Sequence, residues 1–183
     1  MSIKENKKLK FDARAVALVG IMTATMTCGK MALAFLPNIE VVTLLSALYG
    51  YVFGIYGVVA TLLFVCIEPM IYGIGSWIIT YFIYWPSVAL VFMLLSKKGV
   101  GGRWLLTGVA SLMTLCFGVL SSLVDCAFYF GIGENYLLNL PLYYLRGIVF
   151  YLVQLATNFA LFSTLFIFLS GKLNRIKNIK FSD

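Results

Sequence analysis

Apolar residues fill most of the chain in long runs that short polar segments interrupt. The runs cover residues 13–36, 41–72, 77–95 and 104–170. A run of at least about 18 apolar residues is long enough to cross the hydrocarbon core of a bilayer as a helix. The first run ends at Pro37-Asn38, a pair that favours a turn. The pattern therefore predicts an all-α integral membrane protein.

Glycine-containing segments divide two of these runs, although 41–72 could also form one long helix, which would make the number of spans odd and place Lys97 and Lys98 outside. The run 41–72 breaks at "YVFGIYG", residues 51–57, and the run 104–170 breaks at "GIGENYLLNLPL", residues 131–142. One of the spans within 41–72 is then short, about 14 residues or roughly 21 Å, and must be tilted or shielded by neighbouring helices. The result is a bundle of six transmembrane helices.

The cations fall in three clusters, residues 4–14, 97–103 and 172–180. Because basic residues concentrate in cytoplasmic loops, all three clusters are expected in the cytoplasm, which requires an even number of spans between them. The sequence thus predicts a cytoplasmic tail over 1–12, a single six-helix membrane domain over 13–171 and a basic cytoplasmic tail over 172–183. By this topology we expect both termini in the cytoplasm and segments 36–42, 68–76 and 131–141 outside the cell.

Composition supports this class and excludes several others. The 183 residues are 62% hydrophobic and 11% charged, with a mean hydropathy of +0.98, whereas soluble domains carry roughly 25% charged residues. The net charge of +7 follows from the clusters between apolar runs, so it indicates topology and not a nucleic-acid partner. The chain has no histidine, no Walker A loop and no zinc-binding motif. We therefore expect no metal, no cofactor, no catalytic residues and no ATP hydrolysis by this chain.

Four ionisable residues lie within or at the edges of the predicted spans, each near the external end of its helix. Such residues are costly in a membrane and are functional candidates by default. They are two cations and two anions on four different spans: Lys30, Glu68, Asp125 and Arg146. Two interpretations remain open, because these charges could form salt bridges between helix ends or line an outward-facing cavity for a charged solute.

Helical spacing adds candidates to this group. Residues 118, 122, 125 and 129 form a small and polar stripe, which brings Tyr129 to the same face as Asp125. Trp77, Tyr81 and Tyr84 are expected to share a face of the fourth span, with Trp85 adjacent. Trp77 and Tyr81 either contact a solute or form an interfacial aromatic belt. Gln154 and Asn158 share a face of the last span and are weaker candidates, since hydrogen bonds between helices also explain them.

Small residues define a second face on the first span. These residues are Ala13, Ala17, Gly20 and Ala24. A stripe of small residues lets another helix approach closely, either within this chain or from a partner. Lys30 projects about 100° away from the stripe, since each helical residue advances by 100°. The helix can therefore present one face to a partner and its lysine to the bundle interior.

Three motifs and the six-span plan resemble the substrate-binding S components of energy-coupling factor transporters, which import vitamins into prokaryotes. The motifs are "ARAVA" at residues 13–17, "AFLPNIEVVTLLSALYGYVFG" at 34–54 and "EPMIYGIGSWIITYFIYWP" at 68–86. The resemblance implies a solute pocket beneath the first, third and fifth loops, and Ala13 and Ala17 as docking residues. By the same resemblance, the pocket or gate residues are Asn38, Glu40, Glu68, Trp77 and Tyr81.

The resemblance also implies partners and a location. A transmembrane coupling subunit and two cytoplasmic ATPase subunits, which use ATP, would join this chain in the prokaryotic plasma membrane. The expected function is high-affinity capture of a vitamin or vitamin precursor from outside the cell. No pattern supports riboflavin, thiamine, biotin or folate, and a corrinoid or another heterocyclic vitamin stays open. The alternatives are a stand-alone secondary transporter or channel and an intramembrane enzyme.

Overall fold

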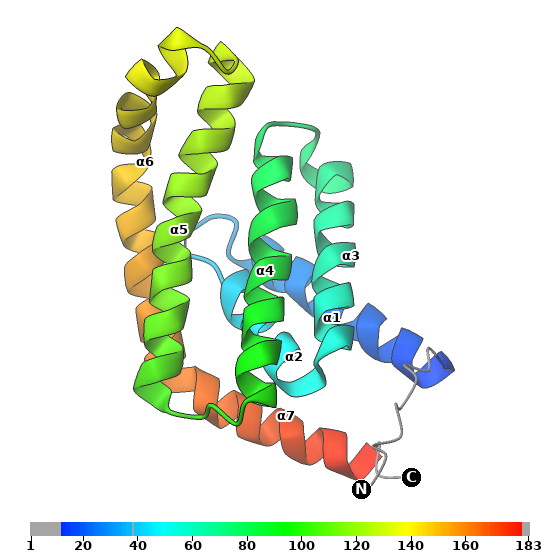
Figure 1. Cartoon of the computed structure of the whole chain (residues 1–183). Coiled ribbons are helices and arrows are strands. Elements are labelled where there is room, and N and C mark those ends of the chain that lie inside the picture. The colour runs from blue at the N-terminus through cyan, green and yellow to red at the C-terminus, as the bar shows by residue number, and fades with distance from the viewer. Residues whose placement is uncertain (1–11, 38, 181–183) are drawn as a thin grey trace, which may run out of the picture.

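A computed structural model describes residues 12–37 and 39–180, and within these residues the chain is helical and contains no strand. This confirms the predicted all-α class. The elements, in chain order (Figure 1), are α1 (Ala13–Ala32), α2 (Val42–Phe53), α3 (Ile55–Tyr72), α4 (Trp77–Lys97), α5 (Arg103–Phe130), α6 (Glu134–Leu161), the π-helical turn η1 (Phe162–Phe166) and α7 (Ile167–Lys180).

Five helical segments of the described chain are long and apolar enough to cross a membrane: α1, α3, α4, α5 and the continuous segment Tyr136–Asn178. Large apolar side chains are also exposed on these segments, for example Leu112, Leu145 and Phe168, as expected where lipid and not water surrounds a protein. The chain is therefore a multi-pass membrane protein.

The remaining predicted span, α2, is only 12 residues long, or about 18 Å. Nine of its residues are buried, because α2 packs against α4, α3, α7 and α1. Its side chains Leu48 and Val42 belong to the main apolar core, together with Phe64 of α3 and Phe92 of α4. The short helix is thus shielded by its neighbours, and its crossing of the membrane as a sixth span stays a prediction.

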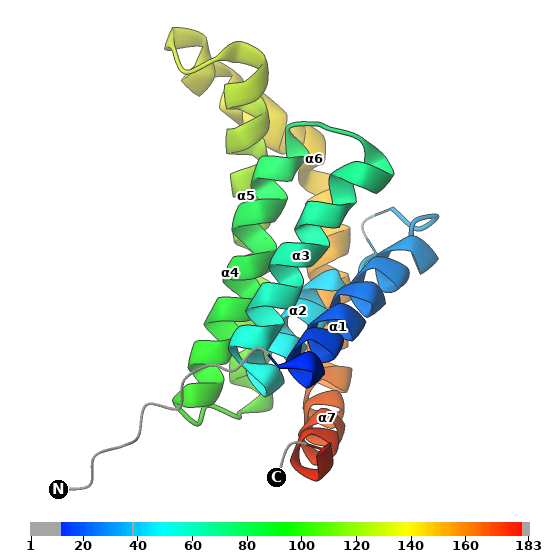
Figure 2. The ribbon, with the colours of Figure 1, turned by 90° about the vertical axis from the view of Figure 1, so that its right-hand side faces the viewer.

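Most connections between the helices lie at two opposite ends of the bundle, and the α1–α2 connection lies at a height between them (Figures 1 and 2). The α3–α4 and α5–α6 connections lie at the upper end, and the α4–α5 connection and α7 lie at the lower end. Helix α7 follows η1 and turns across the base of the bundle (Figure 1), where Lys177 donates a 2.7 Å hydrogen bond to the backbone oxygen of Val52. The described part of the predicted basic tail is therefore helical.

Glycines shape the tight connection between α2 and α3. Gly54 has φ +63°, a backbone conformation that favours glycine, and its N–H caps α2 by donating to the oxygen of Gly50. This confirms the break predicted at "YVFGIYG". Gly50 itself faces α4 so closely that a Cβ atom there would lie 2.0 Å from the backbone oxygen of Ala89. The absence of a side chain at Gly50 is therefore what lets α2 contact α4.

We expect Gly50→Ala to lower the free energy of unfolding by about 1–3 kcal/mol, the usual cost of overpacking, because the α4 backbone must move away. The matched control is Gly108→Ala in α5, where a Cβ atom would meet nothing within 4 Å. Thermal unfolding in detergent micelles measures both variants. Equal stability of the two variants would contradict the close α2–α4 approach.

Candidate functional site

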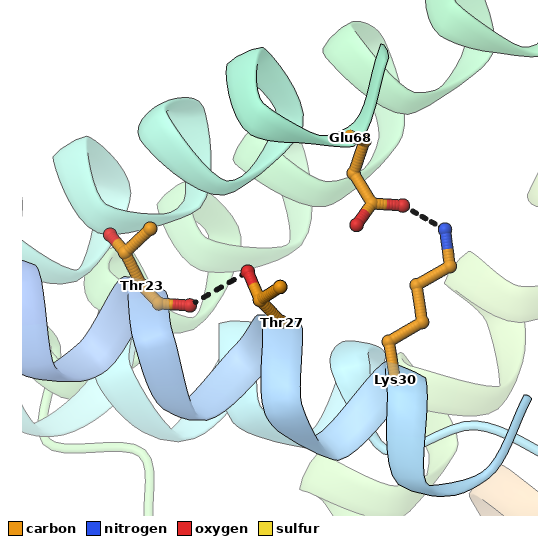
Figure 3. A network of polar contacts seen from close by, with 4 residues as sticks. All are labelled: Thr23, Thr27, Lys30 and Glu68. Carbon is orange, nitrogen blue, oxygen red and sulfur yellow. Dashed lines mark hydrogen bonds and ion pairs between the residues drawn. The ribbon is translucent and has the colours of Figure 1, made fainter. Parts of the chain in front are cut away.

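An ion pair joins the upper ends of α1 and α3. Lys30, in the last turn of α1, extends toward Glu68 of α3 and pairs with its carboxylate (Figure 3). The Glu68 side chain is fully buried and that of Lys30 is 21% exposed. The salt-bridge interpretation of these two charges is therefore confirmed, although a buried pair does not by itself exclude a solute site.

Threonines of α1 fix the helix that carries Lys30. The Thr23 hydroxyl donates to the backbone oxygen of Ala60 on α3 at 3.1 Å, which ties the two helices together below the ion pair. Thr27 donates to the backbone oxygen of Thr23 within α1 at 3.2 Å (Figure 3). Because the α1–α3 contact is set in this way, the side chain of Lys30 meets Glu68 at the end of α3.

Four aromatic rings surround the ammonium group of Lys30. Its Nζ lies 4.5 Å from the ring centre of Tyr72, 4.8 Å from Tyr81, 5.7 Å from Trp85 and 5.8 Å from Trp77. Ring faces attract cations within about 6 Å. The last three rings stand four residues apart on one face of α4. The helical spacing correctly grouped Trp77 and Tyr81, but the third ring near Lys30 is that of Trp85, and Tyr84 packs on Phe117 instead.

A second carboxylate, Glu40, lies on the segment before α2. One of its oxygens accepts the Thr43 N–H at 2.9 Å, and the other accepts the Thr43 hydroxyl at 2.6 Å. The latter oxygen also accepts weaker bonds from the amides of Asn158 at 3.3 Å and Gln154 at 3.5 Å. The two amides are thus the α6 partners of Glu40, and Asn158 also bonds Thr114 of α5 at 3.1 Å.

A cavity of about 260 Å³ lies between these two groups. Its charged lining residues are Lys30 and Glu40, and its aromatic walls come from Tyr72, Tyr81, Trp85 and Phe117. The segment between α1 and α2 covers it with apolar side chains, and Gln154 contributes an amide. We call this the α1–α2 cavity; its full lining is Lys30, Leu33, Ala34, Leu36, Pro37, Ile39, Glu40, Val42, Tyr72, Tyr81, Trp85, Phe117 and Gln154.

The α1–α2 cavity includes some of the predicted site residues and leaves others elsewhere. Glu68 and Trp77 contact Lys30 but do not line the cavity. Asp125 accepts a 2.5 Å hydrogen bond from Ser76, and Tyr129 is 64% exposed beside Tyr143.

Arg146 is likewise exposed, 5.6 Å from the same Tyr143 ring. Neither Arg146, Asp125 nor Tyr129 lines the α1–α2 cavity. The four charged residues predicted at one depth therefore do not form one cluster. Lys30 pairs with Glu68, whereas Asp125 bonds Ser76 and Arg146 lies near Tyr143. Asn38 lies outside the described residues.

The small-residue stripe of α1 lies on the surface of the described chain. Ala13, Ala17, Gly20 and Ala24 are all exposed, whereas Ala15, Val19, Met22, Thr23 and Met26 are the buried residues of α1. Ala17 also lines a groove of about 710 Å³ against α2 and α7. The stripe and Lys30 therefore point to different surroundings, as the helical geometry predicted.

The fold and the cavity define a multi-pass helical membrane protein with a polar, aromatic-walled cavity among its helices. Comparisons with protein-family models, with curated proteins and with solved structures give no match to this chain. The described residues contain no group of three or more histidine, cysteine, aspartate or glutamate side chains that could hold a metal ion. Any function must therefore be argued from the cavity itself.

We expect Lys30→Met to lower the free energy of unfolding by about 3–5 kcal/mol, because it leaves the buried carboxylate of Glu68 without its partner. The double variant Lys30→Met with Glu68→Gln removes both charges and should recover most of this loss. A double-mutant cycle by unfolding in micelles tests the coupling, with Lys98→Met, at an exposed position, as the control. Additive effects of the two substitutions would contradict a stabilising pair.

Proposed function

We propose that this chain is the solute-binding membrane subunit of an ATP-driven micronutrient importer, as its resemblance to energy-coupling factor S components implies. The observation that carries the proposal is the α1–α2 cavity, which combines an ammonium group, a carboxylate and aromatic walls inside an otherwise apolar bundle. Ligand sites have this composition, with mostly apolar walls and a few fixed polar groups.

Unpaired polar atoms beside the cavity support solute binding. The carbonyl oxygen of the Gln154 amide and the indole N–H of Trp85 are buried and have no hydrogen-bond partner in the described chain, and both residues line the cavity. Since buried polar groups in folded proteins are nearly always paired, a bound molecule is a natural source of the missing partners.

The volume of the cavity narrows the class of solute. At about 260 Å³ it is smaller than the roughly 300–1,000 Å³ of sites for drug-sized ligands. A vitamin or precursor built on one ring matches this volume better than a corrinoid macrocycle does. The cavity lies on the side of the bundle that the charge clusters predict to be external, so the solute would enter from outside.

In this proposal, partner subunits drive release into the cell and supply the nucleotide-binding motifs that this sequence does not show. The exposed stripe Ala13, Ala17, Gly20 and Ala24 supports docking to a transmembrane coupling subunit, since small residues allow a second helix to approach closely. Two cytoplasmic ATPases would then bind and hydrolyse ATP. The assembly would work in the plasma membrane of a prokaryotic cell, surrounded by lipid.

The double substitution Ala13→Trp and Ala17→Trp should block complex formation with the coupling subunit and reduce uptake at least about tenfold, because two large rings prevent close helix packing. Solute binding should persist, since neither residue lines the α1–α2 cavity. Mass spectrometry of co-purified small molecules measures solute binding. Uptake by proteoliposomes with the partner subunits measures transport.

The matched control is Leu112→Trp with Leu115→Trp, two exposed positions on α5. The control should keep both solute binding and uptake. Uptake by the purified chain alone, driven by an ion gradient, would instead identify a secondary transporter and refute the proposal.

A further inference from the structure

The charges around the α1–α2 cavity do not balance. Lys30 already pairs with Glu68, behind the cavity wall. Glu40 lines the same cavity, and no cation of the described chain forms an ion pair with it. One ammonium group and two carboxylates therefore leave a net charge of −1 beside an empty volume among membrane helices.

The hydrogen bonds of Glu40 do not remove this charge. Its donors are the N–H and hydroxyl of Thr43 and the amides of Gln154 and Asn158, all of which are neutral groups. Both carboxylate oxygens act as acceptors, as an ionised carboxylate does. These donors hold the side chain in place, but an ionised group in surroundings of low polarity still attracts a cation strongly.

The ring faces and the unpaired amide oxygen of Gln154 also favour positive charge, whereas the unpaired indole N–H of Trp85 would take an acceptor atom of the solute. Tyr81, Trp85 and Phe117 contribute ring surface to the cavity wall, and ring faces attract organic cations. Tyr81 and Trp85 already lie near the ammonium group of Lys30, at 4.8 and 5.7 Å, so a cationic solute would share these two rings with Lys30. Gln154 is 4% exposed, and its amide oxygen is an acceptor without a partner. An N–H group of the solute, including that of a protonated amine, would satisfy the amide oxygen of Gln154, and its positive charge would interact with the ring faces.

We propose that the solute of the α1–α2 cavity is a ring-bearing organic cation and that Glu40 is its counter-ion. Lys30 then neutralises Glu68 and does not bind an acidic group of the solute. An anionic solute would meet the carboxylate of Glu40 and would have to compete with Glu68 for Lys30. This assignment rests on the proposed function of the cavity as a solute site and adds the charge of the solute to it.

The sign of the charge can be tested with three probes of similar shape. These probes are the cation benzyltrimethylammonium, its uncharged isostere neopentylbenzene and the anion phenylmethanesulfonate. Titration of the purified full chain in micelles, followed by tryptophan fluorescence, should give the lowest Kd for the cation, by at least about tenfold over either other probe. This comparison needs no variant. Equal or tighter binding of the anion or the neutral probe, or no binding of the cation, would overturn the inference.

The role of Glu40 is tested by Glu40→Gln, which keeps the shape of the side chain and removes its charge. The Kd of the cation should rise at least about tenfold, because a charge pair within a partly desolvated site is lost. Asp125→Asn is the matched control, since Asp125 bonds Ser76 and does not line the cavity, and it should leave the Kd unchanged. An unchanged Kd in Glu40→Gln contradicts the counter-ion role.

These outcomes separate this inference from the proposed importer function. If the chain binds the cation through Glu40 but takes up solute without a coupling subunit, the cationic solute is supported and the importer is refuted. If the chain binds the sulfonate more tightly but takes up solute only with the coupling subunit, the importer is supported and the cationic solute is overturned.

Discussion

The buried carboxylate of Glu68 is the charge on which the site depends. An ionised group without exposure, inside a bundle that lipid surrounds, requires a partner of opposite charge. Lys30 supplies it from α1 and stands within reach of four aromatic rings. The pair thereby links the ends of α1 and α3 and fixes the point at which the chain leaves α1 to cross over the cavity. A lysine in an apolar run, unusual in a membrane helix, has here a specific structural partner.

The short helix α2 is the second constraint, because its length determines where the cavity can lie. Twelve residues do not fill the height of the bundle, and the segment between Ala32 and Val42 covers the space above them. Glu40 stands at the end of this segment, bonded to Thr43 and to the amides of α6. The carboxylate that accepts two hydrogen bonds from Thr43 at the start of α2 is therefore the same group that lines the cavity.

Hydrophobic patterning and helical spacing predicted much of this arrangement. They found the helical class, the glycine break before α3, the opposed faces of α1 and the aromatic face of α4, because these features depend on local periodicity. They did not find that Gln154 and Asn158 meet Glu40, since that contact joins residues 114 and 118 positions apart. They also grouped Arg146 with Lys30, because both residues were expected at the same depth in the membrane. Arg146 lies on a face of α6 that leaves it exposed beside Tyr143. The depth of a residue in the membrane follows from its position along its helix. The direction in which it faces depends on how the helices pack against one another.

We propose that the α1–α2 cavity opens to the outside of the cell and holds a solute. Ala34 lines the cavity and is exposed, so a cysteine placed there, in a chain whose natural cysteines are replaced by serine, reports on both properties. We expect an impermeant maleimide to label Ala34→Cys rapidly in intact cells, and to label it more slowly when benzyltrimethylammonium is present. Labelling only after the cells are opened, or at a rate that the cation leaves unchanged, would contradict it.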